Sequence, residues 1–428
     1  MTTVLGILIL LGIVVMALIA FRRVEWALVL IIVFYSLEQA LQSYLPFFVT
    51  VPFLLNLSFG AIAAFALFMS MSRGEQPLRG YFNAGTVLIF LVFAWQAMAI
   101  AWSPNPGRGV ETAIGGAPYI ALLVFLAPAL LLNMDRARAM MVPLLLVGTA
   151  TLLMIILNPR AGFYAGRFTV AMGSYRGELE GNPLATANLG GTMMLAASLF
   201  VPAAYRTIVN PLRMAAFATG FAVAFFSGSR GQLLAGVGLS VMLYPLARRM
   251  ENAQQFLGTA AGSGIIGIGA YLGFNLLMSD AAEGRWDVDY AVEAMSGRLD
   301  AALTMTGAYL TSPDRWITGL GPTAAIDETG WSYVHNIPVE MLTELGLVGF
   351  GLYAAACIIA ARGALYLFRR FQHDPVQRSV VAFFVGYAMF DFTMALKQGS
   401  AIFGPGHFMS LLILCKLAKV ESIREQEA

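Results

Sequence analysis

Runs of about 20 mostly apolar residues follow one another along nearly the whole chain, and they limit the folds that it can adopt. The first run, MTTVLGILILLGIVVMALIAFRR, is apolar from its start and carries its positive charges at its end. That order is the reverse of a cleavable signal peptide, so we interpret the run as a first membrane span. The sequence therefore predicts an all-α integral membrane protein.

Composition supports this prediction. Of the 428 residues, 59% are hydrophobic and only 12% are charged, whereas soluble domains carry about 25% charged residues. The net charge of +2 and the lack of any Lys/Arg-rich run argue against a nucleic-acid partner. The two cysteines, Cys357 and Cys415, lie in apolar stretches, where we expect them to pack as small hydrophobes rather than to form a disulfide.

A length of ~20 residues per helix gives about 12 or 13 transmembrane helices. The expected spans are 2–21, 24–41, 53–71, 84–102, 113–133, 139–157, 186–205, 211–228, 231–247, 257–278, 338–368, 379–396 and 401–418. No soluble domain and no internal repeat is visible, so residues 1–428 are predicted to form a single polytopic membrane domain.

Arginines orient these spans, because short cytoplasmic connections are enriched in Lys and Arg. Alternate connections contain Arg22 and Arg23, Arg73 and Arg79, Arg136 and Arg138, Arg206 and Arg213, Arg248 and Arg249, and Arg369, Arg370 and Arg378. These connections are predicted to be cytoplasmic. The longer connections 158–185 and 279–337, and the Gly-Ser-Arg-Gly turn at 228–231, are then outside.

The predicted outer connections nevertheless contain seven arginines. They are Arg160, Arg167, Arg176, Arg230, Arg285, Arg298 and Arg315. Arginines on the side that disfavours them need another role, and binding of an anion is one such role. The alternatives are structural: Arg230 as an interfacial arginine whose side chain reaches water, and Arg298 as a solvated residue on the polar face of a helix.

The larger outer loop contains its own helical pattern. Residues 296–311, SGRLDAALTMTGAYLT, place Leu299, Leu303 and Leu310 at helical spacing, which predicts an amphipathic helix near the membrane surface. Ser-Pro at 312–313 ends it, and ITGLGPT at 317–323 must turn tightly. The loop is therefore expected to be partly helical.

A histidine stands where this loop meets the next span, in WSYVHNIPVEMLTELGLVGF (331–350). Asn336 is predicted to cap the following helix, with Pro338 in its first turn. His335, one of only three histidines, suits a general base at neutral pH; the alternative is a satisfied interfacial histidine. Glu340 and Glu344 lie four residues apart on one helix face, either to orient His335 or an acceptor sugar, or to face a polar crevice.

Motifs for other chemistries are missing from the sequence. It contains no Walker loop and no dinucleotide fingerprint. It has no His-x-x-x-His or paired Cys-x-x-Cys, which disfavours a metal site, and no Gly-x-Ser-x-Gly nucleophile turn. Arginines and one histidine remain, a set that suits charge stabilisation together with a general base.

These blocks, in this order, resemble the superfamily of O-antigen ligases and Wzy-type polysaccharide polymerases over residues 158–350. SGSRGQLL (227–234) is similar to its Arg-x-x-x-Leu motif, filled here by Arg230 and Leu234. GELEGNPLATANLGG (177–191) resembles its Asn-Pro-rich start of a span. The family commonly has a second asparagine straight after the proline, whereas this sequence reads NPLATAN, so either Asn182 or Asn188 serves the motif's role. The 296–322 block followed by VHNIPVEMLTELGLVG resembles its long outer loop and His-Asn helix start.

The resemblance implies a fold and a reaction. Such proteins are glycosyltransferases of GT-C-like architecture on the bacterial inner membrane, and they take a glycan from undecaprenyl diphosphate at the periplasmic face. No cofactor or metal is implied. Arg230 and Arg298, assisted by Arg167 or Arg176, would neutralise the diphosphate leaving group. His335, oriented by Glu340 or Asn336, would deprotonate the acceptor hydroxyl, with inversion at the anomeric carbon.

Several alternatives stay open on the sequence. A ligase would pass the glycan to the lipid A core oligosaccharide, and a polymerase to a lipid-linked repeat unit. A transporter or flippase of a lipid-linked or anionic solute would use charged groups within spans, for which Asp391 and Glu38 are the candidates. A non-catalytic scaffold would leave the outer arginines unexplained.

Overall fold

The computed structural model describes residues 2–164, 166–174, 177–248, 254, 257, 288–402 and 404–428. These residues are mostly helical and form two compact units. The first unit comprises Met1–Pro77, Leu130–Asp287 and Phe368–Phe390, and the second comprises Leu78–Ala129, Val288–Leu367 and Asp391–Ala428.

Nine helices in the described part of the chain are long and apolar enough to cross a membrane. They are Thr3–Ala20, Glu25–Tyr44, Phe53–Ser72, Ala84–Trp102, Pro106–Ala129, Met134–Ile156, Arg206–Phe226, Ile337–Arg370 and Pro375–Lys397. Their lengths of 18 to 34 residues match the thickness of a bilayer core. The chain is therefore a multi-pass, mostly helical membrane protein, as the sequence predicts.

Four of the predicted spans have no counterpart among these nine helices. The spans expected at 186–205, 231–247 and 401–418 correspond to α9 (Pro183–Leu199), α11 (Arg230–Ala247) and α18 (Gly406–Glu427). Of these, α9 has only 17 residues, and α18 ends in a charged segment, VESIREQE. The span expected at 257–278 lies outside the described residues, apart from Leu257.

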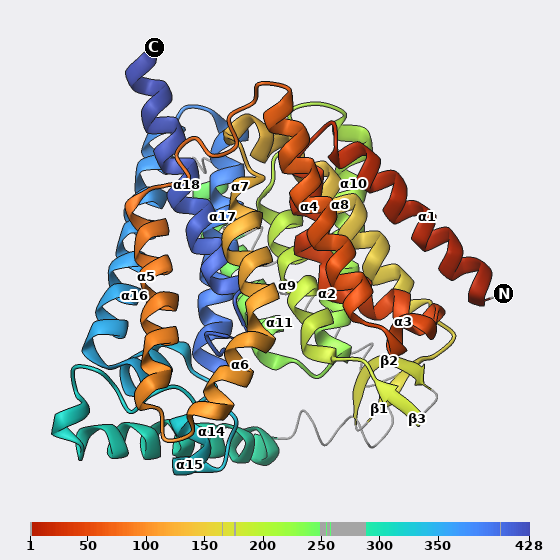
Figure 1. Ribbon diagram of the computed structural model, residues 1–428. Helices are drawn as coiled ribbons and strands as arrows, with labels where there is room; N and C mark the ends of the chain where they lie inside the picture. Colours follow the sequence, from red (N-terminus) through yellow and green to blue (C-terminus); the bar gives the residue numbers. More distant parts are fainter. Residues whose placement is uncertain are drawn as a thin grey trace. The chain divides into compact units, whose positions relative to one another are not determined.

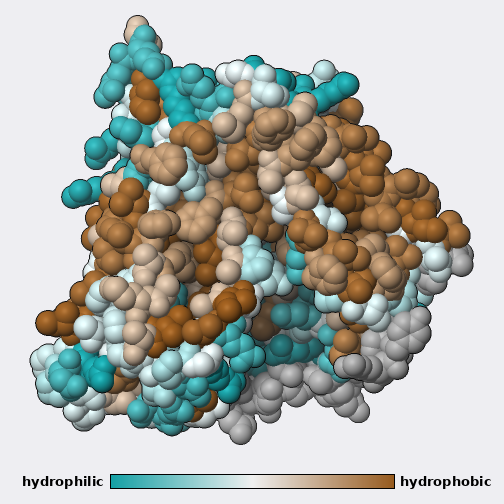
Figure 2. Space-filling view, in the orientation of Figure 1, coloured by the Kyte–Doolittle hydropathy of each residue, from teal (hydrophilic) through white to brown (hydrophobic). Residues whose placement is uncertain are grey.

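The first unit is built around one buried helix (Figure 1). Its elements are α1 (Thr2–Ala20), α2 (Glu25–Tyr44), α3 (Phe47–Thr50), α4 (Phe53–Ser72), α8 (Met134–Ile156), β1 (Ala161–Tyr164), β2 (Arg167–Ser174), β3 (Gly177–Glu180), α9, α10 (Arg206–Phe226), α11 and most of α17 (Pro375–Lys397). Helix α2 packs against α1, α4, α8 and α9. In contrast, α1 carries exposed apolar side chains such as Leu8 and Leu18, as expected of a lipid-facing helix. Much of the visible surface along the helices is hydrophobic (Figure 2).

The connection 158–185, predicted to be outer, contains a small antiparallel sheet in the order β1-β2-β3, which the sequence does not predict in this mostly helical protein. Phe163 pairs with Phe168 across the first two strands, with ring centroids 5.7 Å apart. Val170 is fully buried and packs beside Ala40 and Ile155. A β-branched residue with aromatic neighbours favours a strand, but runs this short give little signal in the sequence.

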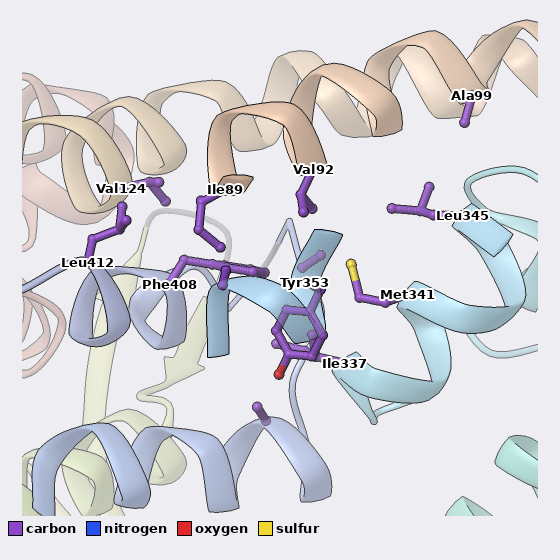
Figure 3. Packing of buried hydrophobic residues seen from close by; sticks show 13 residues of the cluster. Ile89, Val92, Ala99, Val124, Ile337, Met341, Leu345, Tyr353, Phe408 and Leu412 are labelled. Atoms are coloured by element: carbon purple, nitrogen blue, oxygen red, sulfur yellow. The ribbon is translucent and has the colours of Figure 1, made fainter. Parts of the chain in front are cut away.

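The second unit contains the elements that hold the candidate site. They are α5 (Ala84–Ala99), η1 (Ile100–Trp102), α6 (Pro106–Tyr119), the π-helix η2 (Ile120–Leu126), α7 (Ala127–Ala129), α14 (Val288–Leu310), η3 (Pro313–Arg315), α15 (Ala324–Thr329), most of α16 (Ile337–Arg370), the end of α17 and α18. Its core joins α5, η2, α16 and α18, where Ile89, Met341, Tyr353 and Phe408 point toward one another (Figure 3).

Helix α14 lies across the ends of α5 and α16 (Figure 1), and it carries both buried and exposed apolar side chains. Met305 and Ala301 are buried, and Met305 packs against α15. Leu299, Leu303 and Leu310 are exposed by 55%, 59% and 57%. Apolar side chains directed away from the protein suit a helix in the membrane interface, so the amphipathic helix expected at 296–311 is present and extends from Val288.

Helix α16 is broken at Gly346, which the sequence does not predict. Gly346 has a φ of 68°, in the left-handed region. A Cβ atom at this position would overlap the carbonyl oxygen of Ile317, and one at Gly319 would overlap the carbonyl oxygen of Glu344. The 317–323 segment therefore approaches the broken helix so closely that only glycine fits at both positions.

Several backbone groups freed by the break find partners outside the helix. Leu320 N donates to Thr343 O at 2.9 Å, and Gly321 N donates to Glu344 O at 2.9 Å. Trp95 Nε1 donates to Leu345 O at 2.9 Å. Beyond the break, the amides of 347 and 348 donate to the carbonyls of 316 and 317. Because buried backbone groups need partners, the Gly-rich loop and the broken helix stabilise each other.

Candidate functional site

The site begins with the loop between α15 and α16, which ends at His335 and Asn336. His335 has a φ of 61°, a left-handed conformation that is uncommon outside glycine. Asn336 Oδ1 accepts from Val339 N at 3.1 Å, which confirms the predicted cap. Asn336 Nδ2 donates to Leu396 O at 3.0 Å. The amide side chain therefore fixes both the start of α16 and the end of α17.

Two aromatic rings hold the His335 side chain. The ring centroids of Tyr333 and His335 are 4.2 Å apart, and those of Trp331 and His335 are 5.0 Å apart, edge to face. The imidazole is half-buried, and its Nδ1 atom has no hydrogen-bond partner among the residues that the structure describes. The ring is thus fixed by packing, and its buried Nδ1 makes no hydrogen bond to the described residues.

Electrostatics keep this imidazole neutral. Burial lowers the pKa of His335 below its ordinary value, and the positive charge of Arg298 lowers it further. Arg298 lies on α14 and is itself half-buried. An unprotonated imidazole at neutral pH can accept a proton, so the setting suits a general base.

Glu340 and Glu344 are buried on the first part of α16, with exposed fractions of 3% and 5%. Glu340 Oε1 accepts from Ala401 N at 3.2 Å and Ser400 Oγ at 3.3 Å. Glu344 accepts from Thr323 N at 3.2 Å and from the amide of Ala325 at 3.3 Å. Among the described hydrogen bonds, these carboxylates therefore hold loops against α16, and none joins them to His335.

A small cavity of about 20 Å³ lies between these carboxylates and the loop before His335, with room for one water molecule. Its lining includes Gln96, Thr323, Tyr333, Glu340, Glu344 and Ser400. Tyr333 thus contacts His335 on one side and lines this cavity on the other. The cavity is too small for a sugar ring.

The remaining predicted site residues belong to the first unit. Arg230 is the first residue of α11 rather than part of a turn, and Arg167 is the first residue of β2. Arg176 lies outside the described residues. Asn182 caps α9 by accepting from Leu184 N at 3.0 Å, whereas Asn188 Oδ1 has no hydrogen-bond partner in the described part of the chain.

The sequence predicts His335 and Arg298 as site residues, but it does not predict the residues that contact His335, Glu340 and Glu344. Trp331 and Tyr333 stand four and two residues before the histidine, and this aromatic spacing in WSYVH is visible in the sequence. Ser400 and Thr323 are far from Glu340 and Glu344 in sequence, so no local pattern connects them.

Comparison with known protein families gives no matching family model, and comparison with curated proteins gives no match either. The function is therefore argued from the residues of this chain and from the resemblance in its outer loops.

Proposed function

We propose that this membrane protein is a glycosyltransferase that moves a glycan from undecaprenyl diphosphate to a sugar hydroxyl on the periplasmic face of the bacterial inner membrane. The acceptor is the lipid A core, as for an O-antigen ligase, or a lipid-linked repeat unit, as for a Wzy-type polymerase.

The observation that carries the proposal is the setting of His335. The imidazole has a lowered pKa and a buried Nδ1 without a partner among the described residues, and the charge of Arg298 acts on it. Helix α14 carries Arg298, and the exposed apolar side chains of this helix suit a position at the membrane interface. A lipid-borne diphosphate would lie at that depth.

In the proposed reaction, His335 removes the proton from the acceptor hydroxyl. The acceptor oxygen attacks the anomeric carbon from the side opposite the diphosphate, the bond from that carbon to the diphosphate oxygen breaks, and the configuration inverts. Undecaprenyl diphosphate leaves with the bonding electrons. Arg298 stabilises its charge, since a guanidinium is always charged and binds phosphate in bidentate geometry. The proton on His335 then passes to water.

The resemblance adds Arg230, Arg167 and Arg176 as further diphosphate ligands. Arg230→Gln tests this assignment: it should lower transfer strongly while the folded protein keeps its melting temperature. Arg206→Gln, at a predicted cytoplasmic connection, is the matched control and should transfer normally.

The direct test uses purified protein in nanodiscs, a short undecaprenyl-diphosphate glycan and candidate acceptors, with and without EDTA. Transfer to lipid A core would identify a ligase, and a ladder of longer lipid-linked glycans a polymerase. His335→Asn should abolish transfer, because asparagine tolerates the left-handed backbone but supplies no base. The exposed His373 provides the control His373→Asn, which should be fully active; a fully active His335→Asn would refute the proposed base.

The transporter alternative predicts a different outcome of the same reconstitution. Movement of lipid-linked glycan across the bilayer, without transfer to any acceptor, would favour it. Glu38→Gln and Asp391→Asn would then be the informative variants, because both carboxylates lie within helices long and apolar enough to span the membrane.

A further inference from the structure

The buried carboxylates of Glu340 and Glu344 lie one helical turn apart on α16. Like charges at this spacing repel each other, and a carboxylate buried away from water is costly unless its charge is balanced. No ion pair among the described residues includes either carboxylate. The pair is therefore stabilised either by a proton or by a cation, and the described side chains supply no positive partner.

The hydrogen bonds to both side chains favour the ionised forms. Glu344 accepts two backbone amides, from Thr323 and Ala325. Glu340 accepts a backbone amide from Ala401 and the hydroxyl of Ser400, both at Oε1. Donors that point at a carboxylate stabilise its charge, so these contacts favour an ionised group at each position.

One carboxylate oxygen is left over. Oε2 of Glu340 is buried and has no hydrogen-bond partner within the described part of the chain. Glu340 lines the cavity of about 20 Å³ together with the oxygen-bearing side chains of Gln96, Thr323 and Ser400, and that volume holds one water-sized occupant. An ionised Oε2 needs a donor or a cation, and the cavity offers space for either.

We propose that this cavity binds a single hard cation through oxygen ligands, with Oε2 of Glu340 as its charged ligand and neutral side-chain oxygens completing the shell. Na⁺, Mg²⁺ and Ca²⁺ share this preference for oxygen. The described residues contain no group of three or more His, Cys, Asp or Glu side chains that would hold a metal ion, so a softer metal fits less well. The backbone carbonyls freed at the helix break already accept hydrogen bonds.

The cation would hold the start of α16 to two loops, the one that carries Thr323 and the one that carries Ser400. It would also fix Tyr333, which contacts both the cavity and His335. This site is distinct from the proposed diphosphate ligands, and the inference does not depend on the proposed glycosyl transfer.

The test measures the apparent melting temperature of the purified full-length protein by tryptophan fluorescence. The reference buffer contains choline chloride and EDTA, and NaCl, KCl, MgCl₂ or CaCl₂ is titrated at constant ionic strength without chelator. We expect a saturable rise in melting temperature with at least one cation. The salt that produces this rise distinguishes Na⁺ from the divalent ions.

Glu340→Gln is the informative variant, because its amide oxygen can still accept from Ala401 N and Ser400 Oγ while the charge is removed. It should melt higher than the wild type in choline chloride and lose the cation-dependent rise. The exposed Glu328 on α15 gives the control Glu328→Gln, which should keep the whole rise. Ser400→Ala removes one neutral oxygen and should raise the half-saturating cation concentration several-fold.

Two results would overturn the proposal. One is an equal melting temperature in choline and in every metal salt, and the other is a full cation response in Glu340→Gln. If lower pH instead raises the melting temperature equally in all salts, the pair holds a proton and not a cation. No glycan enters this measurement, so its failure would leave the glycosyl-transfer proposal untouched, and the reverse also holds.

Discussion

At the scale of single residues, His335 combines a left-handed backbone conformation with an imidazole that packs against Trp331 and Tyr333. A left-handed conformation costs a non-glycine residue roughly 1–2 kcal/mol, and such strain often accompanies a functional position. We expect His335→Gly to be more stable than His335→Val by at least about 1 kcal/mol, because glycine accepts this φ and a β-branched residue does not. Thermal melts of the two variants in detergent test this order, and the opposite order would contradict the backbone assignment.

The charge of Arg298 gives a second residue-scale prediction. His335 acts as a base only when it is neutral, and its pKa is lowered. Transfer should therefore be retained at neutral pH and lost as pH falls through a value below the ordinary ~6.5. Arg298→Gln removes a positive charge that opposes protonation of His335, so the acid limb of the kcat/KM profile should move to higher pH. Arg298→Lys keeps the charge and should leave the acid limb at the wild-type pH.

The position of this limb is the readout, because both substitutions also change diphosphate binding and therefore the maximal rate. An acid limb that stays at the wild-type pH in Arg298→Gln would show that Arg298 does not act on the base.

At the scale of elements, the glycine contact between α16 and the 317–323 segment should be essential for stability. Gly346→Ala places a Cβ atom against the carbonyl of Ile317 in a left-handed conformation. We expect it to lower the free energy of unfolding by more than about 2 kcal/mol. Gly351→Ala lies on the same helix, where a Cβ atom meets nothing within 4 Å, and it should be neutral or slightly stabilising. Equal melting temperatures for the two variants would refute the contact.

Elements also show what the sequence could and could not predict. Hydropathy located the spans closely, for instance 24–41 against Glu25–Tyr44 and 379–396 against Pro375–Lys397, because the length of an apolar run is a local property. Hydropathy did not predict the break at Gly346. One residue hardly changes the averaged hydropathy of 338–368, and the break depends on contacts with the 317–323 segment. The sequence did not predict the β1-β2-β3 sheet either, because its strands are short and β2 depends on contacts with the distant helix α2.

At the scale of the whole molecule, sequence order predicted which loops carry the candidate residues but not how those residues are held. His335, Asn336 and Arg298 follow from local patterns of charge and capping. The partners of Glu340 and Glu344 come from segments 19 to 61 positions away, so only the folded chain shows that these carboxylates hold loops and line a cavity.

Membrane topology gives the last prediction, because the proposed donor is available only outside the cytoplasm. In the second unit, α14 and α15 lie at one end of its long helices and the C-terminal end of α18 at the other (Figure 1). In a chain with Cys357 and Cys415 replaced by alanine, a cysteine at Asp327 should react with a membrane-impermeant maleimide in spheroplasts. A cysteine at Ala428 should react only after permeabilisation. The opposite pattern would place His335 on the cytoplasmic side, where a periplasmic glycan donor cannot reach it, and the glycosyl-transfer proposal would fail whatever the geometry of the imidazole.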